Sequence, residues 1–183
     1  MQTNVFLSFW LMIDEQEKPH KSIWLLSAAL ACVGAGQSTV FILIPSEVRS
    51  LGFSEFEVGL IFSISALAWM IFSPFWGRLS DRFGRGSIFL LGMIGFAFSM
   101  ASFAAILISA QNLLLPLALV FPLLILTRLI NGLLGSAVRP AAGGRIADLT
   151  SPITRTAGFA RFDAGWQFGV VIGPIVCLLY TSD

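Results

Sequence analysis

Long apolar runs separated by short polar segments dominate the chain from residue 23 onward. Five runs are long enough to cross a bilayer, whose hydrocarbon core takes about 20 apolar residues in a helix. Because a helix satisfies its own backbone hydrogen bonds in lipid, we predict five membrane-spanning helices. They cover residues 23–44, 58–76, 87–109, 117–138 and 162–180.

Composition supports this interpretation. Only 11% of the 183 residues are charged, against about 25% in a typical soluble domain. The fold class we predict is therefore an all-α integral membrane helical bundle. The formal net charge of +1 gives no reason to expect a nucleic-acid partner, and the two cysteines lie in different apolar runs, so we expect no disulfide or metal site.

The distribution of basic residues predicts the orientation. With residues 1–21 as a cytoplasmic N-terminal segment, nine Lys and Arg residues fall on the cytoplasmic side and only Arg49 falls outside. This asymmetry is the positive-inside pattern of multi-pass proteins. The cytoplasmic residues would be Lys18, Lys21, Arg78, Arg82, Arg85, Arg139, Arg145, Arg155 and Arg161.

Small and polar residues recur at helical spacing along one face of the second and third predicted spans. Small residues let membrane helices approach closely, so we expect both stripes to pack inside the bundle. The stripes are Gly59, Ser63, Ala66, Met70, Ser73 and Gly77 in the second span, and Gly92, Gly95, Ser99 and Ser102 in the third.

The fourth span carries a more polar face, formed by Arg128, Asn131, Gly132, Gly135 and Arg139. An arginine inside a membrane costs at least ~2.5 kcal/mol on insertion scales, so it normally faces a partner or a wet cavity. We expect Arg128 and Asn131 to face a functional cavity; the alternative is a structural pair or a side chain that reaches the interface.

The first span has a comparable face with one large polar group, Gln37. A contact with substrate and an ordinary interhelical hydrogen bond are both open for this side chain.

The segment GRLSDRFGRG, residues 77–86, concentrates charge and glycine between the second and third spans. Gly84 allows a sharp turn, and Asp81 could accept hydrogen bonds at a helix N-terminus. Arg82 and Arg85 could pair with Asp81, with Asp148 or with lipid phosphate. A role for the arginines in topology alone would explain the charge, but it would not explain the aspartate or the glycines.

Four segments of the chain resemble the major facilitator superfamily. The segment at residues 77–86 resembles the loop between helices 2 and 3 of that family, with Gly77, Leu79, Asp81, Arg82, Gly84 and Arg85 in the pattern. RLINGLLGSA, residues 128–137, is similar to the fourth-helix motif of proton-coupled members. GWQFGVVIGP, residues 165–174, resembles the fifth-helix motif of antiporters, and ADLTSPITR resembles the loop between helices 4 and 5.

The resemblance implies roles for these residues. Gly77, Asp81, Arg82, Gly84 and Arg85 would form a conformational latch, which we call the latch below. Residues Arg128, Asn131 and Gln37 would serve coupling and the cavity. Asp148 and Arg155 would form loop ion pairs. Close helix packing, which for the fifth helix lies between the two halves, would use Gly132, Gly135, Gly165, Gly169, Gly173 and Pro174.

Family members have twelve helices in two halves, so the resemblance implies the first five helices of such a fold. We expect residues 22–175 to be a partial transmembrane domain. We expect residues 176–183 to be a non-native tail, because the fifth-helix pattern fails after Pro174 and VCLLYTSD resembles a translated sequencing adapter; the alternative is a genuine short C-terminus. The C-terminal half of the same transporter would be a missing partner. Alone, the chain should leave Arg128 exposed and should not transport.

The function implied is secondary active transport of small molecules, as proton-coupled efflux by alternating access. It needs no cofactor, because a proton gradient supplies the energy; the partners are substrate, protons and the lipid bilayer, and the expected location is a bacterial inner membrane. Alternatives are an uptake permease or facilitator for sugars or organic acids, a lipid-headgroup enzyme, and a non-transporting membrane interaction protein. We expect no enzyme activity.

No coupling carboxylate can be selected, since Asp163 is better explained as a cap or an ion-pair partner.

Overall fold

The computed structural model describes residues 19–181, with side chains described from residue 22 to residue 176. Within this part of the chain every regular element is helical, which confirms the predicted all-α class. The elements are α2 (Pro19–Ser50), α3 (Glu55–Phe83), α4 (Arg85–Gln111), α5 (Leu117–Ile130), the π-helix η1 (Asn131–Gly135), α6 (Val138–Leu149) and α7 (Arg155–Thr181).

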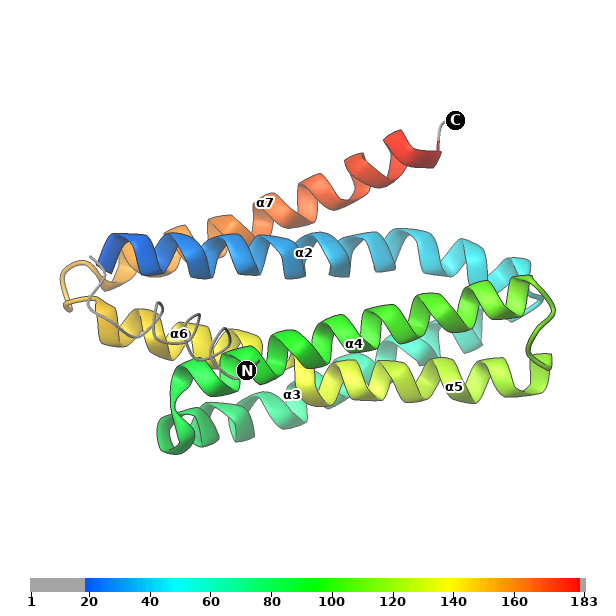
Figure 1. Cartoon of the computed structure of the whole chain (residues 1–183), viewed down its shortest axis with the longest axis horizontal. Helices are drawn as coiled ribbons and strands as arrows, with labels where there is room; N and C mark the ends of the chain where they lie inside the picture. The colour runs from blue at the N-terminus through cyan, green and yellow to red at the C-terminus, as the bar shows by residue number, and fades with distance from the viewer. Residues whose placement is uncertain (1–18, 182–183) are drawn as a thin grey trace, which may run out of the picture.

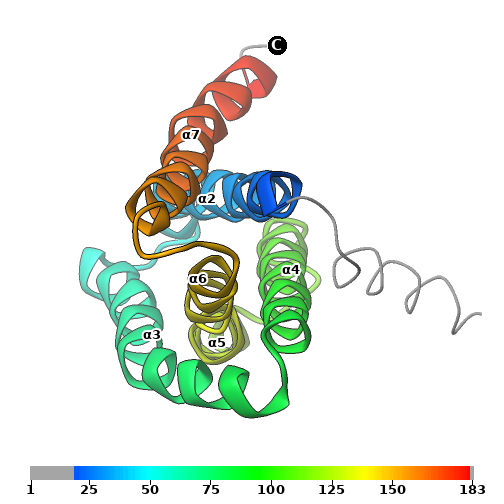
Figure 2. The same cartoon turned by 90° about the vertical axis from the view of Figure 1, so that its left-hand side faces the viewer.

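The rod formed by α5, η1 and α6 lies at the centre of the helix arrangement. Viewed end-on, α3 and α4 flank this rod, α2 closes a third side, and α7 lies on the outer surface of α2 (Figure 2). Seen from the side, α2 and α7 run together and α7 diverges toward its C-terminal end (Figure 1).

Four stretches of the described residues are long and apolar enough to cross a membrane: Ser22–Ser50, Glu55–Phe83, Arg85–Gln111 and Leu117–Leu149. They match the first four predicted spans, and the chain is a multi-pass membrane protein. Helix α7 covers the fifth predicted span, but residues 177–180 of that span lie beyond the described side chains, so the crossing itself stays a prediction. The predicted boundaries of segments 1–21 and 176–183 fall at the edges of the description and also stay predictions.

The helical rod of the fourth span continues to Leu149, beyond the predicted end of the span at residue 138. The apolar run ends at Arg139, but helical hydrogen bonding continues along α6 to Leu149. At η1 the ladder widens into a π turn, which removes carbonyls from the regular α pattern. The Trp76 indole donates to the freed Leu133 carbonyl at 2.6 Å, and the Ser136 hydroxyl donates to the same oxygen at 3.0 Å.

The small-residue stripe of α4 packs inside the bundle, as predicted. Gly92 and Gly95 are buried, and a Cβ on Gly92 would lie 2.9 Å from the backbone nitrogen of Val138. The hydroxyl of the buried Ser99 donates to the Thr127 carbonyl at 2.6 Å. The α4 backbone therefore lies close against the central rod.

The corresponding prediction for α3 is wrong. Gly59 has no atom within 4 Å of its hypothetical Cβ, and Met70 is 66% exposed. Helix α3 instead buries Ile61, Ser65 and Ala68, which lie on another face. Both helices have stripes of the same spacing, but the rod covers the α4 stripe and only the C-terminal end of the α3 stripe, where Gly77 lies beside Pro140.

Candidate functional site

The turn between α3 and α4 brings together three charged residues from three helices. Gly84 adopts φ +92°, a conformation that side chains rarely allow, and so lets α4 begin directly after α3. The Arg85 guanidinium pairs with Asp81 at 2.9 Å and with Asp148 of α6 at 2.5 Å. We call Asp81, Arg85 and Asp148 the Arg85 corner. Its arginine is 27% exposed and its carboxylates about half exposed, so these contacts form at the edge of water.

The Arg85 corner depends on a glycine that the sequence analysis missed. A Cβ on Gly144 would overlap the Arg85 guanidinium, so the absence of a side chain lets Arg85 cross α6 to reach Asp148. The adjacent glycines 143 and 144 within a helix were the available signal. Asp148 is thus in an ion pair, whereas Arg155 donates to the Ala147 carbonyl at 3.3 Å.

The other latch residues are less engaged. A Cβ on Gly77 would make an ordinary contact with Pro140 of α6, at 3.7 Å. Arg82 lies in the last turn of α3 and is exposed. The latch therefore contacts the rest of the chain chiefly through Arg85.

The expectation that Arg128 would be exposed is wrong, because its side chain is 0% exposed. It lies against α4, with its Nη2 atom 3.6 Å from the Met100 sulfur and its guanidinium carbon 4.3 Å from the centre of the Phe103 ring. The central position of the rod produces this burial, since α4 covers the polar face of α5.

The three predicted cavity residues each have a buried polar atom without a hydrogen-bond partner. Among the described residues, the buried side-chain polar atoms without a hydrogen-bond partner are Gln37 Oε1, Arg128 Nε and Nη1, and Asn131 Nδ2. Asn131 Oδ1, in contrast, accepts from the Trp69 indole at 3.3 Å and from Ser65 at 3.5 Å. Buried polar atoms are rarely left unsatisfied, so these atoms have capacity for water or another polar group.

Close packing by glycines joins α7 to α2. Hypothetical Cβ atoms on Gly165 and Gly169 would overlap carbonyls of α2, and one on Gly173 would lie 2.5 Å from the Ala35 carbonyl oxygen. In the same way, a Cβ on Gly34 of α2 would lie 2.6 Å from the Trp166 carbonyl oxygen of α7. In the described chain these α7 glycines pack against α2, and their expected packing between two halves stays a prediction.

The glycines of the rod also pack closely within the chain. A Cβ on Gly132 would lie 2.8 Å from the Ser65 carbonyl of α3, and one on Gly135 would meet Phe96 of α4 at 3.7 Å. The predicted role of Gly132 in helix packing therefore has a specific partner in α3. Pro174 lies inside α7.

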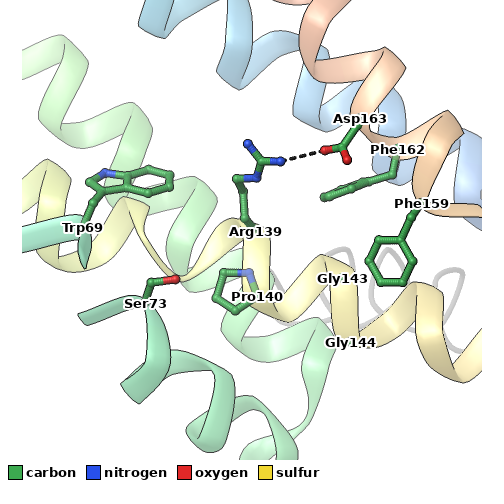
Figure 3. A pocket seen from close by; sticks show the side chains of 9 residues that line it. All are labelled: Trp69, Ser73, Arg139, Pro140, Gly143, Gly144, Phe159, Phe162 and Asp163. Atoms are coloured by element: carbon green, nitrogen blue, oxygen red, sulfur yellow. Dashed lines mark hydrogen bonds and ion pairs between the residues drawn. The ribbon is translucent and has the colours of Figure 1, made fainter. Parts of the chain in front are cut away.

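An open depression of about 420 Å³ lies between α3, α6 and α7 (Figure 3). Trp69 and Ser73 line its α3 side, and Phe159 and Phe162 line its α7 side. The Arg139 guanidinium of α6 and the Asp163 carboxylate of α7 form an ion pair of 2.6 Å at its wall. The prediction of an ion pair for Asp163 is confirmed, but its partner could not be selected from the sequence.

Comparison with known proteins gives these features a family context. The chain matches the model of the Major Facilitator Superfamily over residues 26–182. The chain belongs to this superfamily. The resemblance found in the four sequence segments is therefore confirmed.

Two curated relatives are similar to most of the chain. It is 30% identical over 155 residues to Quinolone resistance protein NorA of Staphylococcus aureus, which covers 85% of the chain and 37% of the relative. It is 32% identical over 157 residues to Tetracycline resistance protein, class B, of Escherichia coli, and this match covers 84% of the chain and 35% of the relative. The chain thus spans about a third of the length of these relatives.

Proposed function

We propose that this chain is part of a secondary active transporter that exports small molecules by alternating access, driven by a proton gradient. Membership of the Major Facilitator Superfamily and similarity to two proteins named for drug resistance support this proposal. The observation that carries it is the Arg85 corner. It joins α3, α4 and α6 through two half-exposed ion pairs, which can break and re-form as helices move.

In this proposal the latch controls access from the cytoplasm. Arg85 holds α6 to the α3–α4 turn in one state, and Asp81 is available to a second set of helices in that state. Those helices would belong to the C-terminal half of the transporter. The N-terminus would be cytoplasmic in a bacterial inner membrane, and the protein would catalyse no chemical reaction.

Arg128, Asn131 and Gln37 would form the polar interior that serves coupling. Their unsatisfied buried atoms offer sites for water and for a proton-carrying partner inside an otherwise apolar bundle. A fully buried arginine with no carboxylate partner among the described residues is unfavourable, so a functional reason for its presence is expected. The energy source would be the proton gradient, with no cofactor.

The direct test is efflux from proteoliposomes that contain the full-length transporter, with and without a proton gradient. We expect accumulation against a substrate gradient only when protons can flow. Equilibration that ignores the proton gradient would support a facilitator instead, and transport only into the cytoplasmic compartment would support an uptake permease. The 183-residue chain alone should give no substrate counterflow.

A second test separates coupling from folding at Arg128. Replacing a buried charge with an apolar residue of similar length often leaves stability unchanged or raises it, by about 1–4 kcal/mol. We therefore expect Arg128→Met to keep or raise thermal stability in detergent while it removes proton-driven efflux. Wild-type efflux in this variant would contradict the coupling role.

The matching test of the latch is Asp81→Asn. It keeps the size of the side chain but weakens the pairing with Arg85, and we expect a sharp loss of transport. Glu55→Gln is the control, because Glu55 also forms a 2.6 Å ion pair, with Arg49, at the opposite end of α3. Equal rates in Asp81→Asn and wild type would rule out the latch assignment.

A further inference from the structure

Two uncharged side chains of one neighbouring helix hold Arg128 inside the bundle. The Nη2 atom of Arg128 lies 3.6 Å from the Met100 sulfur, and its guanidinium carbon lies 4.3 Å from the centre of the Phe103 ring. Both side chains come from α4, which runs beside the α5–η1–α6 rod (Figure 2). Because they are three residues apart, they lie on the same face of that helix. We call Met100 and Phe103 the Arg128 clamp.

The same helix also fixes the backbone next to Arg128. The hydroxyl of Ser99 donates to the carbonyl of Thr127 at 2.6 Å, and both residues are buried. Thr127 directly precedes Arg128, so α4 contacts the rod at the residue before the arginine as well as at the arginine side chain. The guanidinium therefore has a defined position, although it forms no ion pair with any described residue.

The clamp holds the arginine without neutralising it. A thioether is a weak acceptor, and an aromatic ring attracts a cation through its quadrupole but carries no net charge. Exclusion of water strengthens the attraction to the ring, and Phe103 is only 2% exposed. A carboxylate in place of either group would bind the guanidinium more strongly, but it would also cancel its charge.

The position of the clamp makes the remaining charge effective. Phe103 belongs to one apolar cluster of the bundle, and Met100 packs against another. A charge acts over a longer distance in apolar surroundings than in water. The Nε and Nη1 atoms of Arg128 have no partner among the described residues, so the guanidinium retains both its charge and two groups that can donate hydrogen bonds.

We propose that Met100 and Phe103 are positioning residues for proton coupling, which hold the Arg128 guanidinium in place and leave its charge to the proton-carrying partner. That partner would bind the guanidinium when it is ionised and release it when it is protonated. A neutral clamp permits this exchange, because it does not compete for the charge. The assignment rests on the proposed function, since it names residues that support the coupling role of Arg128.

The first test changes the charge of the clamp at nearly constant size, in the full-length transporter in proteoliposomes. We expect Met100→Glu to reduce proton-driven efflux by about tenfold or more, because the new carboxylate pairs permanently with Arg128. Met100→Gln has the same length without the charge and should stay within about threefold of wild type. Equal efflux in the two variants would overturn the assignment. If Met100→Glu fails to fold, the second test decides.

The second test weakens the attraction to the ring and leaves its shape nearly unchanged. Fluorine withdraws electron density from the face of the ring, so a ring-trifluorinated phenylalanine at position 103 should bind the guanidinium less strongly. We expect proton-driven efflux to fall about fivefold and the midpoint of thermal unfolding in detergent to fall by about 2 °C. The same replacement at Phe98, which is exposed on α4, is the control and should change neither.

A dependence on Arg128 separates this assignment from general effects of fluorine. In the Arg128→Met variant, fluorination at position 103 should not change the unfolding midpoint. Equal shifts with and without Arg128, or no shift in either, would overturn the assignment. Efflux by wild type that ignores the proton gradient would refute the proposed function, and the coupling role with it, even where the unfolding midpoint still depends on Arg128. Proton-driven efflux that is insensitive to both changes would refute this assignment alone.

Discussion

Two contacts in this protein join helices by opposite means. Between α2 and α7, glycines bring backbone against backbone, and Gly169 has no room for even a methyl group beside Ala31. At the Arg85 corner, flexible side chains reach across a gap and meet at the edge of water. A close backbone contact can hold only one arrangement, whereas half-exposed ion pairs can exchange partners at little cost. The comparison indicates which contact is suited to move during transport.

The largest effect is expected where the backbone contact is broken. In Gly169→Val, the new side chain would overlap the Ala31 carbonyl, and α7 would have to move away from α2. We expect a loss of about 3 kcal/mol in stability, at the upper end for overpacked sites. Thermal unfolding in detergent measures it. Gly59→Val is the control, because no atom lies within 4 Å of that site; a similar loss in both variants would show that helix propensity, and not packing, is responsible.

A smaller effect is expected at the Arg85 corner. Asp148→Asn removes one of two carboxylates from a partly exposed arginine, so we expect a loss of about 0.5 kcal/mol. Hydrogen exchange of the first turn of α4 should increase at the same time, because Arg85 is then held only by Asp81. A loss close to that of Gly169→Val would mean that the corner is a rigid structural contact.

Salt should distinguish the two contacts without further mutation. Screening at about 1 M salt reduces the range of charge interactions to roughly 3 Å. The difference in thermal stability between wild type and Asp148→Asn should therefore shrink toward zero as NaCl is raised. The deficit of Gly169→Val should persist. A deficit at Gly169 that disappears with salt would contradict the packing explanation.

The smallest effect on stability is expected at Gly144. An added methyl group would meet the Arg85 guanidinium, which is the mobile end of a long side chain and can move aside. The gain in helix propensity from Gly to Ala, up to about 1 kcal/mol, is large enough to offset the lost ion pair. We expect Gly144→Ala to stay within about 0.5 kcal/mol of wild type while hydrogen exchange near Arg85 increases. Gly169→Ala, whose obstacle is backbone, should be clearly less stable than Gly144→Ala.

Much of the candidate site could be predicted because it depends on local sequence. Gly84 lies at a turn that requires positive φ, and Asp81 and Arg85 lie four residues apart on the two sides of that turn, so their proximity follows from the local sequence. The Asp148 contact was only one of several pairings open to Arg85. The Arg139–Asp163 pair joins residues 24 positions apart on different helices, and no local pattern selects that partner.

The sequence by itself determined the class of the protein, the first four membrane spans and the family, because run length, charge position and motif spacing are local properties. Only the tertiary structure decided which faces are inside. The α3 and α4 stripes look alike in sequence, yet the α5–η1–α6 rod covers the α4 stripe and, of the α3 stripe, only the end at Gly77. In a soluble helix, polarity would mark the outer face, but lipid is as apolar as the bundle interior. Close packing against particular neighbours therefore decides burial, and it buries Arg128 completely.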